Sequence, residues 1–155
     1  MSLTTDMARF ERNTAAPLLD FNLQVLDQAL AVVAAHLAQA APPYAGPVGS
    51  HLRHVIEHYE ALLQGCHAGV VDYDSRRRDR QLEVCPITAR HRLQGLRQQL
   101  GRWTPAVLDQ AVRVLGQGGV AGDFNFDVPS SVARELAFLA SHAVHHFALL
   151  GPHLQ

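Results

Sequence analysis

The chain has 155 residues, 48% of them hydrophobic and 17% charged, and its formal net charge is −1. This length is typical of one domain, and the hydrophobic fraction suffices for a buried core, which argues against disorder. The near-zero charge excludes a global electrostatic preference for nucleic acid or an anionic membrane. The absence of lysine excludes lysine Schiff bases, and two cysteines are too few for a disulfide framework.

The N-terminal segment, MSLTTDMARFERN, is too polar for a signal peptide. We expect residues 1–15 to form a loose terminus of a single domain that spans residues 1–155. No run approaches the roughly 20 apolar residues that a membrane span needs. We therefore expect a cytoplasmic protein that has no membrane or nucleic-acid partner.

The first predicted helix covers residues 18–40, where leucines recur at steps of three and four. Proline and glycine break this helix at residues 41–49. Ser50 is expected to cap a second helix over residues 51–65.

The segment at residues 70–84, VVDYDSRRRDRQLEV, mixes acids and bases without a period. It is predicted to be a loop, either solvated and self-neutralised or binding an anion or a second subunit. Pro86 is expected to open a third helix over residues 86–103, because proline suits the first helical turn.

Apolar residues alternate with polar ones and glycines at residues 111–129, which predicts a short β-hairpin or extended excursion. The last helix is expected to begin after Ser130 or Ser131 and to end at Gly151. Together the elements predict an all-α fold, a four-helix bundle with a short β-hairpin or extended insertion before the last helix.

Histidines stand out on the last helix, where a helical projection places Glu135, His142 and His146 in the middle of the apolar face and His145 at its edge. Two histidines four residues apart can bind the same metal ion. Two ligands are too few for a tight site, so a third is expected from another helix.

The second helix offers His51, His54 and His58, which lie within a narrow arc beside its apolar stripe. One or more of them can therefore face the last helix. Inward histidines are costly to bury unless they are partnered, and a metal ion would satisfy their nitrogens. The alternative is that each ring is an ordinary core or surface histidine.

The segments HLRHVIEHYEALL and SSVARELAFLASHAVHHFALL resemble DinB/YfiT-like proteins, and the likeness covers about residues 18–150. This resemblance implies a four-helix bundle that holds a divalent metal, commonly zinc or nickel. Carried over to this chain, the ligands are the pair His142 and His146 and, by its place before VIEHY, His54. His51 stays possible as the third ligand, and Glu135 is a possible further ligand that we infer from the helical projection.

The resemblance also implies a thiol-dependent transferase, isomerase or hydrolase reaction on a small molecule. Three neutral imidazoles leave the metal charge undiminished, so a bound water or thiol becomes strongly acidic. Glu57, His58 and His145 could relay protons, and Arg76 and Arg78 could hold an anionic low-molecular-weight thiol or substrate. The alternative is a non-catalytic metal-binding or structural helical module, and in either case we expect a homodimer.

Overall fold

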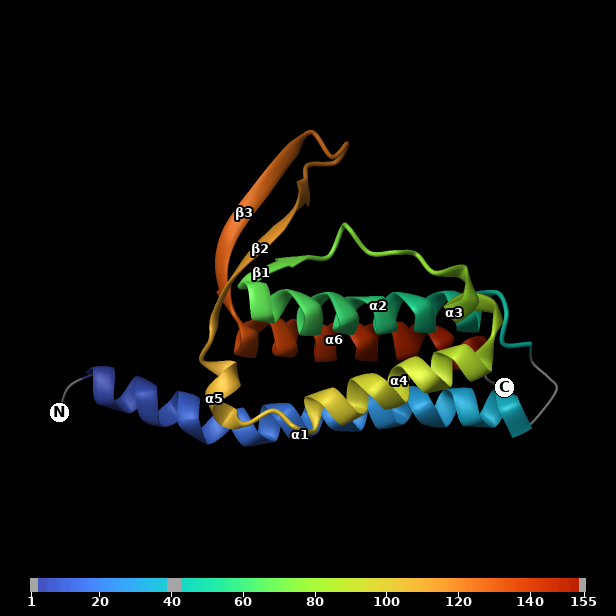
Figure 1. The fold of residues 1–155 in the computed structure, drawn as a ribbon, viewed down its shortest axis with the longest axis horizontal. Helices are drawn as coiled ribbons and strands as arrows, with labels where there is room; N and C mark the ends of the chain where they lie inside the picture. The colour runs from blue at the N-terminus through green and yellow to red at the C-terminus, as the bar shows by residue number, and fades with distance from the viewer. Residues whose placement is uncertain (1–2, 39–42, 154–155) are drawn as a thin grey trace.

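The computed structural model describes residues 3–38 and 43–153, with side chains from Thr14 onward. Four long helices pack side by side in it: α1 (Leu3–Ala38), α2 (Pro47–Ala68), α4 (Pro86–Leu100) and α6 (Val132–Leu150). Helix α1 contacts α4 and α6, and α2 contacts the same two helices (Figure 1). Their apolar faces share one core, whose fully buried side chains include Leu26, Leu52, Ile56, Leu93, Leu136 and Leu139.

A three-stranded mixed sheet accompanies these helices, so the expectation of an all-α fold is wrong. Strand β1 (Val70–Asp72) pairs in parallel with β2 (Ala111–Gly118), and β2 pairs antiparallel with β3 (Phe124–Ser131). The hairpin of β2 and β3 confirms the extended excursion predicted at residues 111–129, and its far end projects away from the helices (Figure 1). The strand that sequence reasoning missed is β1, where Val71 is fully buried against the core.

The segment at residues 70–84 was predicted to be a loop, but it contains a strand and a short helix. After β1 the chain runs over α2 and then forms the short helix α3 (Arg80–Val84). The Asp79 side chain caps this helix by accepting a hydrogen bond from the Gln81 backbone N–H at 2.9 Å. Leu82 anchors α3 because its side chain is fully buried. Two further short pieces are α5 (Pro105–Leu108) and the 3₁₀ helix η1 (Gly151–His153).

Some helix ends differ from the predicted ones. Helix α1 is helical from Leu3 onward, although residues 1–15 were expected to be loose; residues 1–2 and 39–42 lie outside the described part. Helix α2 begins at Pro47 and not after Ser50, since proline is well suited to the first turn. The prediction for α6 is confirmed, because the Ser131 hydroxyl accepts a hydrogen bond from the Arg134 backbone N–H at 3.2 Å.

The segment Thr14–Ala38 of α1 is long and apolar enough to cross a membrane by length and composition. This corrects the expectation that no run in the chain meets that criterion. The core helix of a folded domain and a signal sequence near the N-terminus both pass the same test, and the inner side of this segment, including Leu26 and Val33, is buried in the core.

Candidate metal site

Three histidine nitrogens converge where α2 and α6 run side by side. The Nε2 atom of His142 lies 3.1 Å from Nε2 of His54 and 3.1 Å from Nε2 of His146. Ligand atoms of the three residues all lie within 4.8 Å of one another. A tetrahedral site with metal–nitrogen bonds of 2.0–2.1 Å separates its nitrogens by about 3.3 Å. The three histidines therefore lie close enough together to bind one metal ion.

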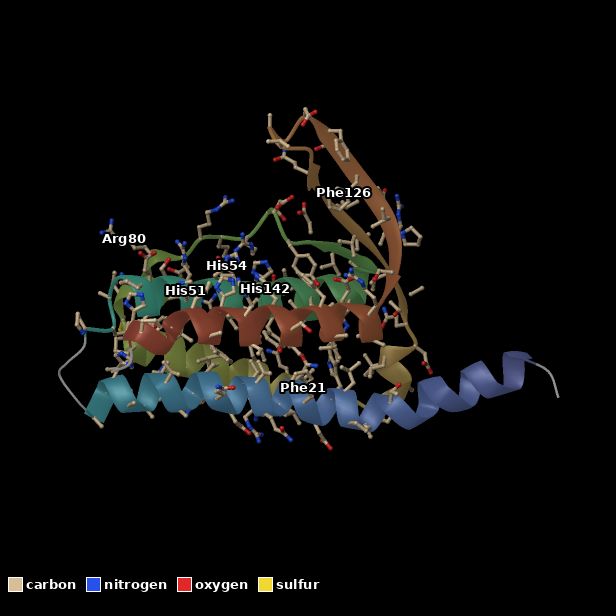
Figure 2. All side chains as sticks on the ribbon, turned by 180° about the vertical axis from the view of Figure 1, so that it is seen from behind. Phe21, His51, His54, Arg80, Phe126 and His142 are labelled. Carbon is tan, nitrogen blue, oxygen red and sulfur yellow. The ribbon has the colours of Figure 1, made fainter. Side chains whose placement is uncertain are left out.

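The local sequence explains this convergence. His142 and His146 are one helical turn apart on α6, so their rings project from the same side. His54 projects from α2 toward that pair, and Figure 2 shows His51, His54 and His142 gathered beneath the segment that joins β1 to α3. His145 is exposed, with its ring centroid 5.8 Å from that of His146. The structure thus brings together the three residues that the resemblance implied.

The histidines lie beside the apolar face of α6 rather than in its middle, which corrects the helical projection. The buried face runs through Leu136, Leu139, Ala140 and Ala143, whereas His142 and His146 are only half-buried. Two alanines of this face, Ala140 and Ala143, are fully buried. The shift matters for function, since a half-buried site can exchange ligands with solvent.

The environment of the rings favours their neutral form. Burial, assisted by the neighbouring His58 and Arg76, lowers the pKa of His54 to about 3. Burial also lowers the pKa of His146 to about 4, and it lowers the pKa of His142. Neutral imidazole is the form that binds metals, because the ligating nitrogen must carry a free lone pair.

His51 lies behind His146 rather than among the three converging nitrogens. Its Nδ1 atom is 2.7 Å from Nδ1 of His146. A ring that binds a metal through Nε2 carries its proton on Nδ1 and needs an acceptor there. His51 can supply that acceptor, so it is placed to orient His146 and to fix its tautomer.

Contacts through Tyr73 link His58 to Glu135. His58 is buried, and its Nδ1 donates to the carbonyl oxygen of His54 at 2.7 Å, which leaves Nε2 of a neutral ring as an acceptor. Burial also lowers the pKa of His58 to about 4. Its ring stacks on Tyr73 at a centroid distance of 5.4 Å, and the Tyr73 hydroxyl donates to Glu135 at 2.7 Å.

Glu135 is not part of the converging group. Its buried carboxylate accepts hydrogen bonds from Tyr73, from the Ser130 hydroxyl at 2.6 Å and from Arg134 at 3.0 Å. These bonds tie α6 to β3 and to the residue after β1, which is a structural role. The sequence pointed to Glu135 as an inward acid but not to Tyr73, because one tyrosine in a charged segment has no distinctive spacing.

The segment after β1 brings one arginine to the histidines. The Nε atom of Arg76 donates to the Tyr73 carbonyl oxygen at 2.5 Å, and its Nη1 lies 3.0 Å from Nδ1 of His54. Arg78 is exposed, with a left-handed φ of 51°. Glu57 is buried, and its Oε1 atom accepts the Asp79 backbone N–H at 2.6 Å, so it holds this segment against α2.

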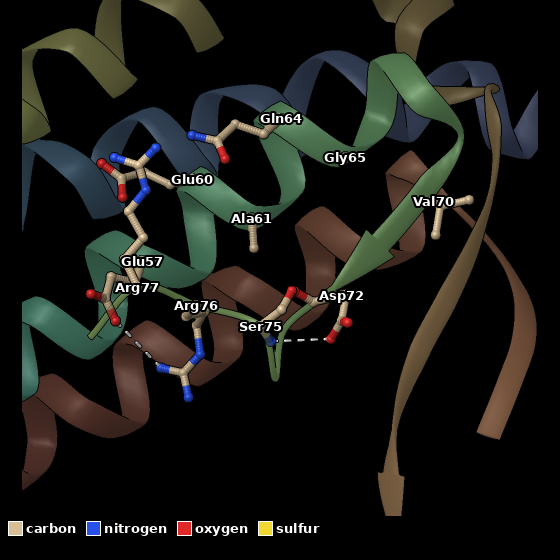
Figure 3. A pocket seen from close by; sticks show the side chains of 10 residues that line it. All are labelled: Glu57, Glu60, Ala61, Gln64, Gly65, Val70, Asp72, Ser75, Arg76 and Arg77. Atoms are coloured by element: carbon tan, nitrogen blue, oxygen red, sulfur yellow. Dashed lines mark hydrogen bonds and ion pairs between the residues drawn. The ribbon is translucent and has the colours of Figure 1, made fainter. Parts of the chain in front are cut away.

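Two cavities lie near the site, although none of the converging histidines lines either of them. One, of about 330 Å³, has mainly apolar and aromatic walls that include Tyr73, Phe126, Val128 and Phe138. Phe138 connects it to the histidines, because its ring stacks on His142 at a centroid distance of 5.5 Å. The other, of about 300 Å³, is more polar and lies between α2 and the segment after β1, with Glu57, Asp72, Arg76 and Arg77 among its lining residues (Figure 3).

Comparison with protein-family models, curated proteins and solved structures gives no match.

Proposed function

We propose that this protein is a divalent-metal-dependent enzyme that acts on a small molecule, by thiol-dependent transfer or by hydrolysis. The convergence of three Nε2 atoms from His54, His142 and His146 carries this proposal. Catalytic zinc sites have three protein ligands and one open position, whereas structural sites are closed by four. Three histidines converge in the part of the chain that the structure describes, and Zn²⁺ or Ni²⁺ suits imidazole ligands.

A divalent ion at this position would make a bound water or thiol acidic at neutral pH. The residues around the site have matching roles. His51 orients His146 through the Nδ1 contact, and Nε2 of the neutral His58 ring is free to accept a hydrogen bond because Nδ1 donates to a carbonyl oxygen. His145 stands at the exposed rim, where it can pass a proton to solvent. Glu57 also holds the segment after β1 through its Oε1 atom.

The aromatic cavity is the place that we propose for the electrophilic substrate. Phe138 both lines this cavity and stacks on His142, so a molecule bound there lies one ring away from the histidines. Apolar walls with a few polar groups are typical of sites for small molecules. We therefore propose an apolar or aromatic substrate, with a low-molecular-weight thiol or water as the attacking group.

We also propose that the chain is related to DinB/YfiT-like proteins. The support is the pairing of one histidine of α2 with an H-x-x-x-H pair on α6, which is the ligand pattern that the resemblance implies.

A metal-dependence assay tests the proposed activity. Zinc- or nickel-loaded protein is incubated with a panel of low-molecular-weight thiols and aromatic electrophiles, beside chelator-treated protein and a His142→Ala variant. We expect turnover that requires the metal and is lost in the variant. If the protein binds metal stoichiometrically but no member of the panel is turned over in a metal-dependent way, a non-catalytic metal-binding module is the better description.

A further inference from the structure

Arg76 faces the candidate ligand His54 in an arrangement that differs from that of the other ligands. Its Nη1 atom lies 3.0 Å from Nδ1 of His54. A guanidinium group has only donors, so Nδ1 of His54 must act as the acceptor in this contact. The proton of the neutral ring then lies on Nε2, which is the atom that points toward His142.

This contact is incompatible with a metal on Nε2 of His54. A neutral imidazole that binds a metal through Nε2 carries its proton on Nδ1. Arg76 and His54 would then point two hydrogen-bond donors at each other at 3.0 Å, and the positive charge of Arg76 would lie close to that of the metal ion. His146 has no such conflict, because its Nδ1 faces a ring nitrogen of His51 that can accept. The contact with Arg76 therefore favours the Nε2–H tautomer of His54 for as long as it persists.

Glu57 offers Arg76 a second position. The Oε2 atom of Glu57 has no hydrogen-bond partner, although it is buried in a side chain that is only 2% exposed and so cannot bond to bulk water instead. Arg76 Nη1 lies 3.9 Å away, which is an ion pair without a hydrogen bond. Figure 3 shows the Arg76 guanidinium directed toward Glu57 at the edge of the polar cavity. Leaving a buried carboxylate oxygen unbonded costs free energy, so a small movement of Arg76 would be favourable there.

We infer that Arg76 is a positioning residue that exchanges partners when the metal binds. In this structure it contacts His54, and a metal on Nε2 of His54 would move it onto Glu57 Oε2, which frees Nδ1 of His54 to carry its proton. Arg76 thereby opposes metal binding, and Glu57 favours it. Because Arg76 also holds the Tyr73 carbonyl oxygen, metal loading becomes coupled to the segment after β1. The inference rests on the proposed metal site.

Substitutions of opposite expected sign test this inference, with zinc affinity measured by competition against a chromogenic chelator. Arg76→Gln removes the charge and provides a carbonyl that can accept from His54, so we expect zinc to bind about tenfold more tightly. Arg76→Lys keeps a donor-only cation, and its affinity should stay near that of the wild type. Glu57→Gln still accepts the Asp79 N–H but loses the charge that holds Arg76, so zinc should bind about tenfold more weakly.

Arg77→Gln is the matched control, because Arg77 is exposed on the same segment, and its affinity should not change. A folded Arg76→Gln variant that binds zinc no more tightly than wild type would overturn the inference. A second measurement needs no variant: the guanidinium NMR signals of wild-type Arg76 should shift on zinc binding while those of Arg77 do not, and unchanged Arg76 signals would also overturn it. Failure of wild-type protein to bind zinc would instead remove the proposed function, and this inference with it.

Discussion

Replacement of His142 by alanine removes the central nitrogen of the candidate site, which lies 3.1 Å from both other Nε2 atoms. Four-ligand structural zinc sites contribute about 10–16 kcal/mol, or about 2.5–4 kcal/mol per ligand. Loss of one ligand should therefore weaken zinc binding about 100- to 1,000-fold. His142 is only half-buried, so the metal-free variant should fold.

The assay is thermal unfolding with and without zinc at 100 times the wild-type Kd. Wild-type protein should gain about 2.7 kcal/mol, and the variant at the same zinc concentration at most about 0.4 kcal/mol. For a chain of this size, these gains correspond to a rise in Tm of about 5–10 °C and of about 1 °C. His145→Ala is the control, since this exposed neighbour lies outside the converging group. A full rise in Tm for His142→Ala, or its loss in His145→Ala, would refute the assignment.

Three further outcomes follow from the same contacts. His51→Ala removes the acceptor for Nδ1 of His146 and should weaken zinc binding about tenfold in a chelator competition, while an unchanged affinity would show that His51 does not orient the ligand. Burial raises the pKa of the Tyr59 phenol, so the stability that its neutral form contributes is fully present below pH 10 and is lost as the pH rises further. In urea unfolding, Tyr59→Phe should therefore lose less stability above pH 10 than wild type does, and an equal loss would contradict this. Leu139→Ala should lower the free energy of unfolding by about 2–5 kcal/mol and Leu149→Ala by far less, because the two side chains are 1% and 46% exposed. Equal losses of unfolding free energy in the two variants would show that the core does not lie on the Leu139 side of α6.

The sequence was sufficient to find the histidines because their signal is local. The spacing of His142 and His146 depends only on helical geometry, and the cluster on α2 repeats it. Helical geometry alone does not choose between His54 and His51, since both lie on the same side of α2, and the choice of His54 rests on the resemblance. The structure separates them by partner: His54 faces Nε2 of His142, and His51 faces Nδ1 of His146.

The sheet was harder to predict because β1 is stabilised by distant residues. Its three residues pair with β2 more than forty positions later, through Val70 with Arg113 and Val71 with Val114. No periodicity within VVD reveals a parallel partner. The same limit applies to Arg76, which reaches His54 only because Glu57 and Asp79 hold the intervening segment against α2.

The phase of α6 differs from the helical projection because alanines, and not leucines alone, line its buried face. Leu149 lies on the same side of α6 as His142 and His146 by helical periodicity, yet it is 46% exposed. Ala140 and Ala143 are fully buried instead, since close helix packing selects small side chains. The consequence is a candidate metal site at the edge of the core rather than within it.

We propose that three imidazoles bind one divalent ion and leave one coordination position open. Metal analysis of protein purified without a nickel column, combined with X-ray absorption at the metal edge, decides whether they do. We expect one zinc or nickel ion per chain with three imidazole nitrogens and at least one water, and loss of the ion in His54→Ala and in His142→Ala. Wild-type protein without stoichiometric metal, or variants that both retain it, would contradict the claim.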